Sequence, residues 1–222
     1  MRRLAAFGGS FDPVHRGHTQ GARHALASLQ LDLVIFVPAG CPPHKLGEPL
    51  TPFCHRFAML ALALREEERF VISPVEQQVE GPTFTVDTIQ RLRTQFPGDR
   101  LFFLMGSDSF AQITTWHRWR ELPDLATLVV LWRPWGHRDW GEVPVPEEFR
   151  PRLVRMPQAA SAGAQLAEGS ILLLDNDPVE VAASDLRERL RRGEWPGDLV
   201  DAAVLSYARK HRLYHEKGHD GR

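Results

Sequence analysis

The 222-residue sequence has few cysteines, no long apolar run and almost no net charge. Cys41 and Cys54 form neither a CxxC pair nor a disulfide framework, so we expect reduced thiols and a cytoplasmic protein. No window approaches about 18 consecutive apolar residues, which argues against a membrane-spanning helix. The first residues, Met1-Arg2-Arg3-Leu4, lack the apolar region of a signal peptide, and we expect none.

The near-neutral charge limits the kind of partner. The net charge is −1, from 27 basic and 28 acidic residues. No overall field would recruit a nucleic-acid polymer or an anionic membrane, so any phosphate must be bound by a local basic cluster. The 43% hydrophobic and 25% charged content is that of an ordinary globular protein. We expect a single domain over 1–222, without internal repeats or low-complexity tracts.

Short apolar runs alternate with helical stretches, which predicts an α/β protein whose mostly parallel sheet has helices on both faces. The predicted helices cover 17–29, 52–64 and 83–96, with Thr51 as the N-cap of the second. We interpret the proline-rich region 134–170 as an irregular excursion from the sheet. Residues 184–215 are expected to form two helices, the first capped by Ser184 and stopped by Gly193. The expected strands are 4–7, 33–37, 70–72, 101–105, 128–131 and 171–174.

The most informative stretch is FGGSFDPVHRGH, residues 7–18, between the first strand and the first helix. Its glycines let the backbone approach a phosphate, and the free N–H groups of a helix start favour anions. His15 and His18 lie one helical turn apart and can donate hydrogen bonds to the same charged group. The plain alternative, a Gly-Gly turn with two surface histidines, is disfavoured by this spacing.

Two further segments carry polar groups just past predicted strands. His44 and Lys45, held by two prolines, are candidate cations for a phosphate or a solvated basic pair. A zinc half-site from Cys41 and His44 lacks a second pair of ligands. Asp108, after a strand and a glycine, suits ribose hydroxyls, although Ser107 or Asp108 could equally cap a helix.

The later segments are more ambiguous. One of Trp116 and Trp119 is expected to stack on a flat heterocycle and the other to pack in the core. Single-stranded nucleic acid binding by this aromatic and basic segment is disfavoured by the net charge. Ser184 and Arg187 could clamp a triphosphate at a second helix start, or be a cap and a surface arginine. Histidines recur at 211, 215 and 219, which we interpret as a polar tail rather than a metal site.

Taken in order, these segments resemble the bacterial nicotinate mononucleotide adenylyltransferases, which belong to the nucleotidylyltransferase superfamily with the T/H-x-G-H motif. The resemblance covers nearly the whole chain and implies a Rossmann-like doubly wound fold. It implies a reaction of ATP with nicotinate mononucleotide that gives deamido-NAD and pyrophosphate. The implied cofactor is Mg²⁺, held mainly through ATP phosphates and water, with no protein metal ligand. The matching pieces are GGSFDPVHRGH, VPAGCPPHK, GPTFTVDTI, FLMGSDSF, TWHRWREL, LWRP and SYARKHRLY.

The resemblance also implies roles for individual residues. The catalytic ones are His15, His18, Lys45 and Arg187. The ATP-binding ones are Gly8, Gly9, Ser10, Phe11, His15, His18, Gly106, Asp108, Val181, Ser184 and Arg187. The mononucleotide-binding ones are Asp12, His44, Lys45, Thr83, Phe84, Thr85, Trp116 and Arg133.

One departure concerns the terminal motif, which in the family usually reads I-S-[SAT]-[ST]-x-[IL]-R. Here residues 181–187 read VAASDLR, so Ala182 lacks a hydroxyl and weaker ATP binding is expected. Phe84, where the family often has tyrosine, is a milder change.

Several alternatives stay open. An enzyme acting on pantetheine phosphate is disfavoured by the chain length and the TWHRW segment. A preference for nicotinamide mononucleotide is not excluded, because selection of a carboxylate would depend on backbone N–H groups. A non-catalytic nucleotide sensor is disfavoured by the intact His15, His18 and Arg187. The sequence also leaves open whether the chain forms a homo-oligomer.

Overall fold

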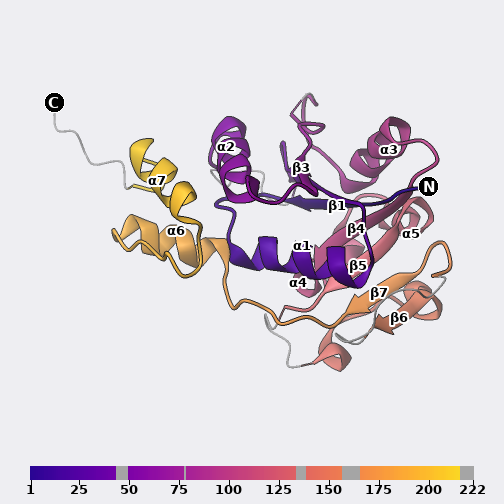
Figure 1. Cartoon of the computed structure of the whole chain (residues 1–222). Helices are drawn as coiled ribbons and strands as arrows, with labels where there is room; N and C mark the ends of the chain where they lie inside the picture. The colour runs from indigo at the N-terminus through magenta and orange to yellow at the C-terminus, as the bar shows by residue number, and fades with distance from the viewer. Residues whose placement is uncertain (44–49, 78, 134–138, 157–165, 216–222) are drawn as a thin grey trace.

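The computed structural model describes residues 1–43, 50–77, 79–133, 139–156 and 166–215. Within them, seven strands form one sheet in the order β3-β2-β1-β4-β5-β7-β6 (Figure 1). All six strand pairs are parallel, as predicted for alternating strands and helices. The strands are β1 Arg3–Gly9, β2 Leu33–Pro38, β3 Phe70–Ile72, β4 Arg100–Gly106, β5 Thr127–Leu131, β6 Leu153–Met156 and β7 Ile171–Leu174.

The central strand β1 is buried on both faces. Successive side chains of a strand point to opposite sides, so Ala5 and Phe7 join one hydrophobic cluster while Leu4 and Ala6 join the other. Helices α1, α2, α6 and α7 pack into the first cluster, and α3, α4 and α5 into the second. The prediction of helices on both faces is therefore confirmed. The helices are α1 Arg16–Ser28, α2 Phe53–Leu64, α3 Thr85–Gln95, α4 Ser107–Phe110, α5 Leu122–Leu125, α6 Ala183–Arg191 and α7 Ala202–Lys210.

The last two helices lie beside the start of α1 (Figure 1). The backbone N–H of Arg16 donates to the carbonyl of Leu199 at 2.8 Å, and α7 packs against α2. The C-terminal part of the described chain is thereby brought to the carboxyl end of β1. None of the described helices combines the length and apolar character needed to cross a membrane.

The structure corrects the sequence predictions in three places. The stretch predicted as an excursion returns to the sheet as β6, which pairs with β7 at one edge. Thr51 does not cap α2, whose N-cap is Pro52. Ser184 does not cap α6, whose N-cap is Ala182, whereas Gly193 does follow the end of this helix with a φ of 77°.

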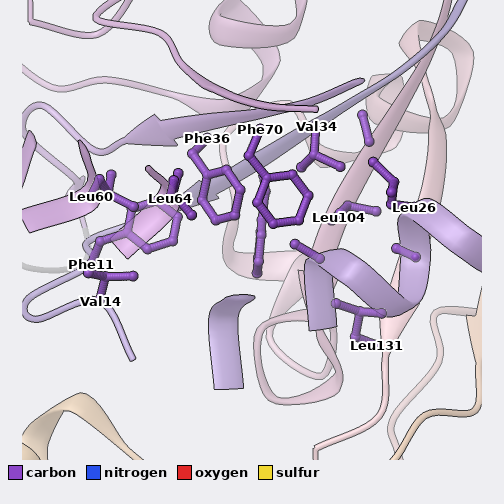
Figure 2. Packing of buried hydrophobic residues seen from close by; sticks show 14 of the residues in the cluster. Phe11, Val14, Leu26, Val34, Phe36, Leu60, Leu64, Phe70, Leu104 and Leu131 are labelled. Carbon is purple, nitrogen blue, oxygen red and sulfur yellow. The ribbon is translucent and has the colours of Figure 1, made fainter. Parts of the chain in front are cut away.

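The loop between β1 and α1 is anchored in the first cluster. Phe11 and Val14 are almost fully buried beside Leu60 and Leu64 of α2 (Figure 2). The ring of Phe11 also packs against Phe36 of β2, with ring centroids 5.6 Å apart. A loop whose apolar side chains are inserted in the core presents its backbone in a fixed position.

A buried arginine of α2 joins three loops at the same end of the sheet. Arg56 is 1% exposed, and its guanidinium donates to the carbonyls of Thr51, Ser10 and Ala39 at 2.8, 2.9 and 2.7 Å. Buried carbonyls need such partners, and charged donors make strong ones. Arg56 therefore links the segments that follow β1 and β2 to the start of α2.

We expect Arg56→Met to lower the free energy of unfolding by about 3–5 kcal/mol, because the methionine keeps apolar bulk but leaves three carbonyls without their donors. Urea denaturation measures this. The matched control is Arg69→Met, at a side chain that is 57% exposed, for which the change should stay within about 0.5 kcal/mol. Equal losses in the two variants would contradict the linking role of Arg56.

Candidate functional site

A cavity of about 820 Å³ opens beyond the carboxyl ends of β1, β4 and β5, where parallel α/β sheets bind ligands. Most of the predicted residues come together there. Those predicted for ATP are Gly8, Gly9, Ser10, Phe11, His15, His18, Gly106, Asp108, Ser184 and Arg187. Those predicted for the mononucleotide are Thr83, Phe84, Thr85, Trp116 and Arg133.

Asp12 lies behind the cavity wall rather than in it. It is 1% exposed, and one carboxylate oxygen accepts the N–H of Thr51 at 3.0 Å. The other accepts the hydroxyl of Tyr214 at 2.6 Å. The structure does not support the direct contact with the mononucleotide that the resemblance implied for Asp12, because both oxygens already have partners inside the protein.

Three predicted site residues remain, Val181, His44 and Lys45. Val181 does not line the cavity, but its carbonyl accepts from the guanidinium of Arg133 at 2.9 Å. His44 and Lys45 lie outside the described residues. Their roles stay predictions.

The two histidines of the opening motif form a stacked pair at the start of α1. The ring centroids of His15 and His18 are 3.7 Å apart and the rings are inclined by 30°. The backbone N–H of His15 donates to Nδ1 of His18 at 3.3 Å. This contact requires Nδ1 to be unprotonated, so a neutral His18 carries its proton on Nε2, where it can be donated to a ligand.

Burial keeps both rings neutral. Burial first, and then the positive charge of Arg133, lower the pKa of His15 from its ordinary value to about 3. Burial, followed by His15 and Arg133, lowers the pKa of His18 well below its ordinary range. Without a ligand the pair therefore offers neutral hydrogen-bond donors rather than fixed charges.

The glycine between the histidines is required by the packing. A Cβ at Gly17 would lie 3.0 Å from Val181 Cγ1 and 3.1 Å from the ring of His15. Such contacts are tighter than side chains normally make. Gly17 thus lets α1 approach the chain that leads into α6, which closes one side of the cavity.

Arg133 and Asp108 face each other across the end of β4. The guanidinium of Arg133 lies 3.4 Å from Oδ2 of Asp108, while the hydroxyl of Ser107 bonds the backbone N–H and carbonyl of Arg133. Neither Ser107 nor Asp108 caps α4, whose N-cap is Gly106, so the capping alternative is wrong. Among the described residues, Oδ1 of Asp108 is buried without a hydrogen-bond partner, as expected of a group that awaits a ligand.

The contacts of Arg133 place it near the histidines. Its charge acts on His15 and His18, and its guanidinium reaches Val181 just before α6. The resemblance assigned Arg133 to the mononucleotide. In the structure it contacts Asp108 and Val181, two of the residues predicted for ATP.

The opposite end of the cavity is aromatic. Trp116 is half-buried and meets Phe103 edge to face at 6.4 Å, and Phe84 lies against the ring of His117 at 4.3 Å. Trp119 is buried in the core, which confirms that one tryptophan packs. Trp116 packs partly against the same cluster and also lines the cavity, and its stacking on a ligand stays a prediction. Phe84 is also the N-cap of α3 and has no side-chain capping bond, so the first N–H groups of α3 are positioned for an anion.

Glu76 supports this aromatic end and was missed by the sequence analysis. Its carboxylate, 9% exposed, accepts the N–H of Gly40 at 3.0 Å and the hydroxyl of Thr88 at 2.6 Å. Thr83 and Cys41 exchange two further hydrogen bonds, at 2.9 and 3.3 Å. Glu76 occurs in an irregular segment without periodicity, so no local pattern pointed to it.

Arg187 of α6 connects the opening loop to the C-terminal helices. Its guanidinium donates to the carbonyl of Asp12 at 2.9 Å and lines the cavity. Ser184 lies in the first turn of α6, and its hydroxyl bonds the carboxylate of Asp185 at 3.2 Å. The two side chains predicted to clamp a triphosphate are therefore on the cavity, beside the histidine pair.

The fold, with this cavity beyond the carboxyl ends of its strands, fits a nucleotidyl-transfer protein, and comparisons with known proteins agree. The cytidylyltransferase-like family model matches residues 6–189. A Thermomicrobium roseum protein described as "Probable nicotinate-nucleotide adenylyltransferase" is 38% identical, with 96% of this chain and 92% of the relative covered. An Aeromonas hydrophila protein of the same description is 39% identical, with 95% and 96% covered.

A solved structure shares the fold. The nicotinic acid mononucleotide adenylyltransferase of Plasmodium falciparum, complexed with NaAD, matches with a TM-score of 0.71 at 18% identity, over 96% of this chain and 98% of that one. The same protein complexed with APC gives 0.70. The chain belongs to the cytidylyltransferase-like family. Within it, the chain belongs with the nicotinate-nucleotide adenylyltransferases.

The neutral histidine pair predicts how stability depends on pH. The folded pKa of His15 lies below its unfolded value, so its contribution is complete above about pH 6.5 and is lost as the pH falls toward 3. Each such histidine should add about 1.4 kcal/mol per pH unit to the slope in the free energy of unfolding. Urea denaturation between pH 7.5 and 5 should show a shallower slope for His15→Asn than for the wild-type protein. An unchanged slope in His15→Asn would contradict the burial argument.

Proposed function

We propose that this protein joins ATP and nicotinate mononucleotide to give deamido-NAD and pyrophosphate, a step of NAD biosynthesis. The observation that carries the proposal is one continuous cavity that runs from the histidine pair and Arg187 to the aromatic end at Trp116. The first end suits a triphosphate, and the second suits a flat ring with a negative charge. The relatives that match nearly the whole chain carry the same activity in their descriptions.

The chemistry needs positioning more than acid–base catalysis. A phosphate oxygen of the mononucleotide attacks the α-phosphorus of ATP, and the bond from that phosphorus to the bridging oxygen of pyrophosphate breaks. The attacking phosphate is already a nucleophile, so no general base is required. The protein must align the two phosphates and offset the charge on the departing pyrophosphate.

The residues at the first end can supply these donors. His18, with its proton on Nε2, donates a neutral hydrogen bond, and His15 stacks on it. The guanidiniums of Arg133 and Arg187 line the same cavity and offer forked donors for phosphate oxygens. Oδ1 of Asp108, which is buried and has no hydrogen-bond partner among the residues that the structure describes, can accept from a ribose hydroxyl.

We propose that Mg²⁺ arrives with ATP. The described carboxylates that line the cavity, Glu76, Asp108 and Asp177, come from separate segments. No three histidine, cysteine, aspartate or glutamate side chains of the described residues are grouped to hold a metal ion. An ion held through phosphates and water would neutralise the pyrophosphate. Cys41 and Cys54 are free thiols, in keeping with the cytoplasmic setting that we propose.

The closest alternative substrate is nicotinamide mononucleotide. The start of α3 favours the carboxylate, because free N–H groups there would face an anion in the nicotinate and a neutral amide in the nicotinamide. We expect kcat/KM for nicotinate mononucleotide to exceed that for nicotinamide mononucleotide by at least about tenfold.

A coupled pyrophosphate-release assay that offers ATP with each mononucleotide in turn measures this ratio. Pantetheine phosphate serves as the negative control. Equal rates with the two mononucleotides would make the enzyme dual-specific. No turnover with any of the three would favour the non-catalytic sensor.

We expect His18→Ala to lower kcat by about 10²–10³, the size for losing one donor to a charged transition state. Steady-state kinetics with a parallel melting curve separates this from unfolding. The control is His24→Ala, at a half-buried histidine of the same helix whose ring bonds Ser28 at 3.3 Å. A folded His18→Ala protein with more than about a third of the wild-type kcat would exclude the catalytic role.

A further inference from the structure

Tyr214, a half-buried residue after α7, makes a long-range contact with the opening loop. Its hydroxyl donates to Oδ1 of Asp12 at 2.6 Å, across 202 positions of the chain. Burial first, and then the Asp12 carboxylate, raise the pKa of Tyr214 far above its ordinary value, so the hydroxyl keeps its proton and remains the donor. With Thr51 on the other oxygen, the buried carboxylate of Asp12 has a partner on each oxygen.

The loop that carries Asp12 has a strained backbone. Phe11 has a φ of 49°, in the left-handed region that a bulky residue rarely adopts. Such a conformation persists only where surrounding contacts over-determine it. Those contacts are donated from outside the loop, by Arg56 to the carbonyl of Ser10 and by Arg187 to the carbonyl of Asp12. Tyr214 adds a further contact to this loop, from the segment after α7.

The loop conformation sets the surroundings of a predicted catalytic side chain. The ring of Phe11 meets the ring of His18 edge to face, with centroids 4.9 Å apart and an angle of 69°. His18 in turn stacks on His15. Movement of Asp12 would shift its neighbour Phe11 and release one face of His18.

We infer that Tyr214 is a positioning residue, which holds the loop 10–14 through Asp12 and thereby fixes His18 for the transferring phosphate. The inference rests on the proposed function and deepens it. Tyr214 touches neither the cavity nor the reacting atoms among the described contacts. Its effect on the rate is transmitted through Asp12 and Phe11.

The first test is Tyr214→Phe, which removes the hydroxyl and keeps the ring. We expect kcat to fall by about tenfold, since a loosened catalytic geometry costs rate more than binding. The matched control is Tyr207→Phe in the same C-terminal segment, whose hydroxyl bonds Nδ1 of His55 at 2.9 Å, away from the loop. We expect Tyr207→Phe to lower the melting temperature comparably and to keep the wild-type kcat. Wild-type kcat in Tyr214→Phe, or an equal loss in both variants, overturns the inference.

The second test is the double variant His18→Ala with Tyr214→Phe. If Tyr214 acts through His18, the double variant is as slow as His18→Ala alone, within about twofold. A further tenfold loss would mean that the two side chains act independently, which overturns the proposed path.

The proposed function and this inference can fail separately. If the wild-type chain turns over neither mononucleotide, the proposed function fails, and calorimetric binding of ATP takes over as the readout for Tyr214. The affinity should weaken by about threefold in Tyr214→Phe, because a displaced His18 would lose part of a hydrogen bond to the phosphate, and stay unchanged in Tyr207→Phe. Equal affinities in all three proteins overturn the inference in that case as well.

Discussion

Burial lowers the pKa of both His15 and His18 and keeps the stacked pair neutral, and the rest of the site follows from this constraint. The ring centroids are 3.7 Å apart, so a charge on either ring would be poorly hydrated and charges on both would repel each other. The histidines therefore provide directed N–H groups, and the positive charge must come from elsewhere. We propose that the guanidiniums of Arg133 and Arg187, which line the same cavity, supply it.

The position of the histidine pair also depends on residues of the hydrophobic core. A stacked pair at a helix start needs a glycine between its members, which Gly17 provides, and a wall behind it, which is the ring of Phe11. That ring in turn depends on a strained loop held by Arg56. The polar site and the first hydrophobic cluster therefore share a side chain, because Phe11 contacts His18 and is also part of the core.

The sequence predicted the parts of this arrangement that are local. Apolar runs marked six of the strands, and the spacing of His15 and His18 marked the helix start. Arg56 could also have been found, since it lies three residues after Phe53 and four before Leu60, on the apolar face of a predicted helix. Local sequence patterns could not predict contacts between segments that are far apart in the chain. Thr51 and Ser184 have good capping propensity, but tertiary contacts set where α2 and α6 begin, as they set the short edge strand β6.

These contacts explain the structural effect of the missing hydroxyl at Ala182, where the family's terminal motif usually has serine. Ala182 is the N-cap of α6 and has no side-chain oxygen, so the first N–H groups of α6 receive no side-chain cap. The start of this helix is nevertheless fixed on both sides, because Arg133 bonds the carbonyl of Val181 and Arg187 bonds that of Asp12. Uncapped N–H groups held beside two guanidiniums remain suited to an anion. The missing hydroxyl therefore leaves in place the helix start that we propose binds a phosphate.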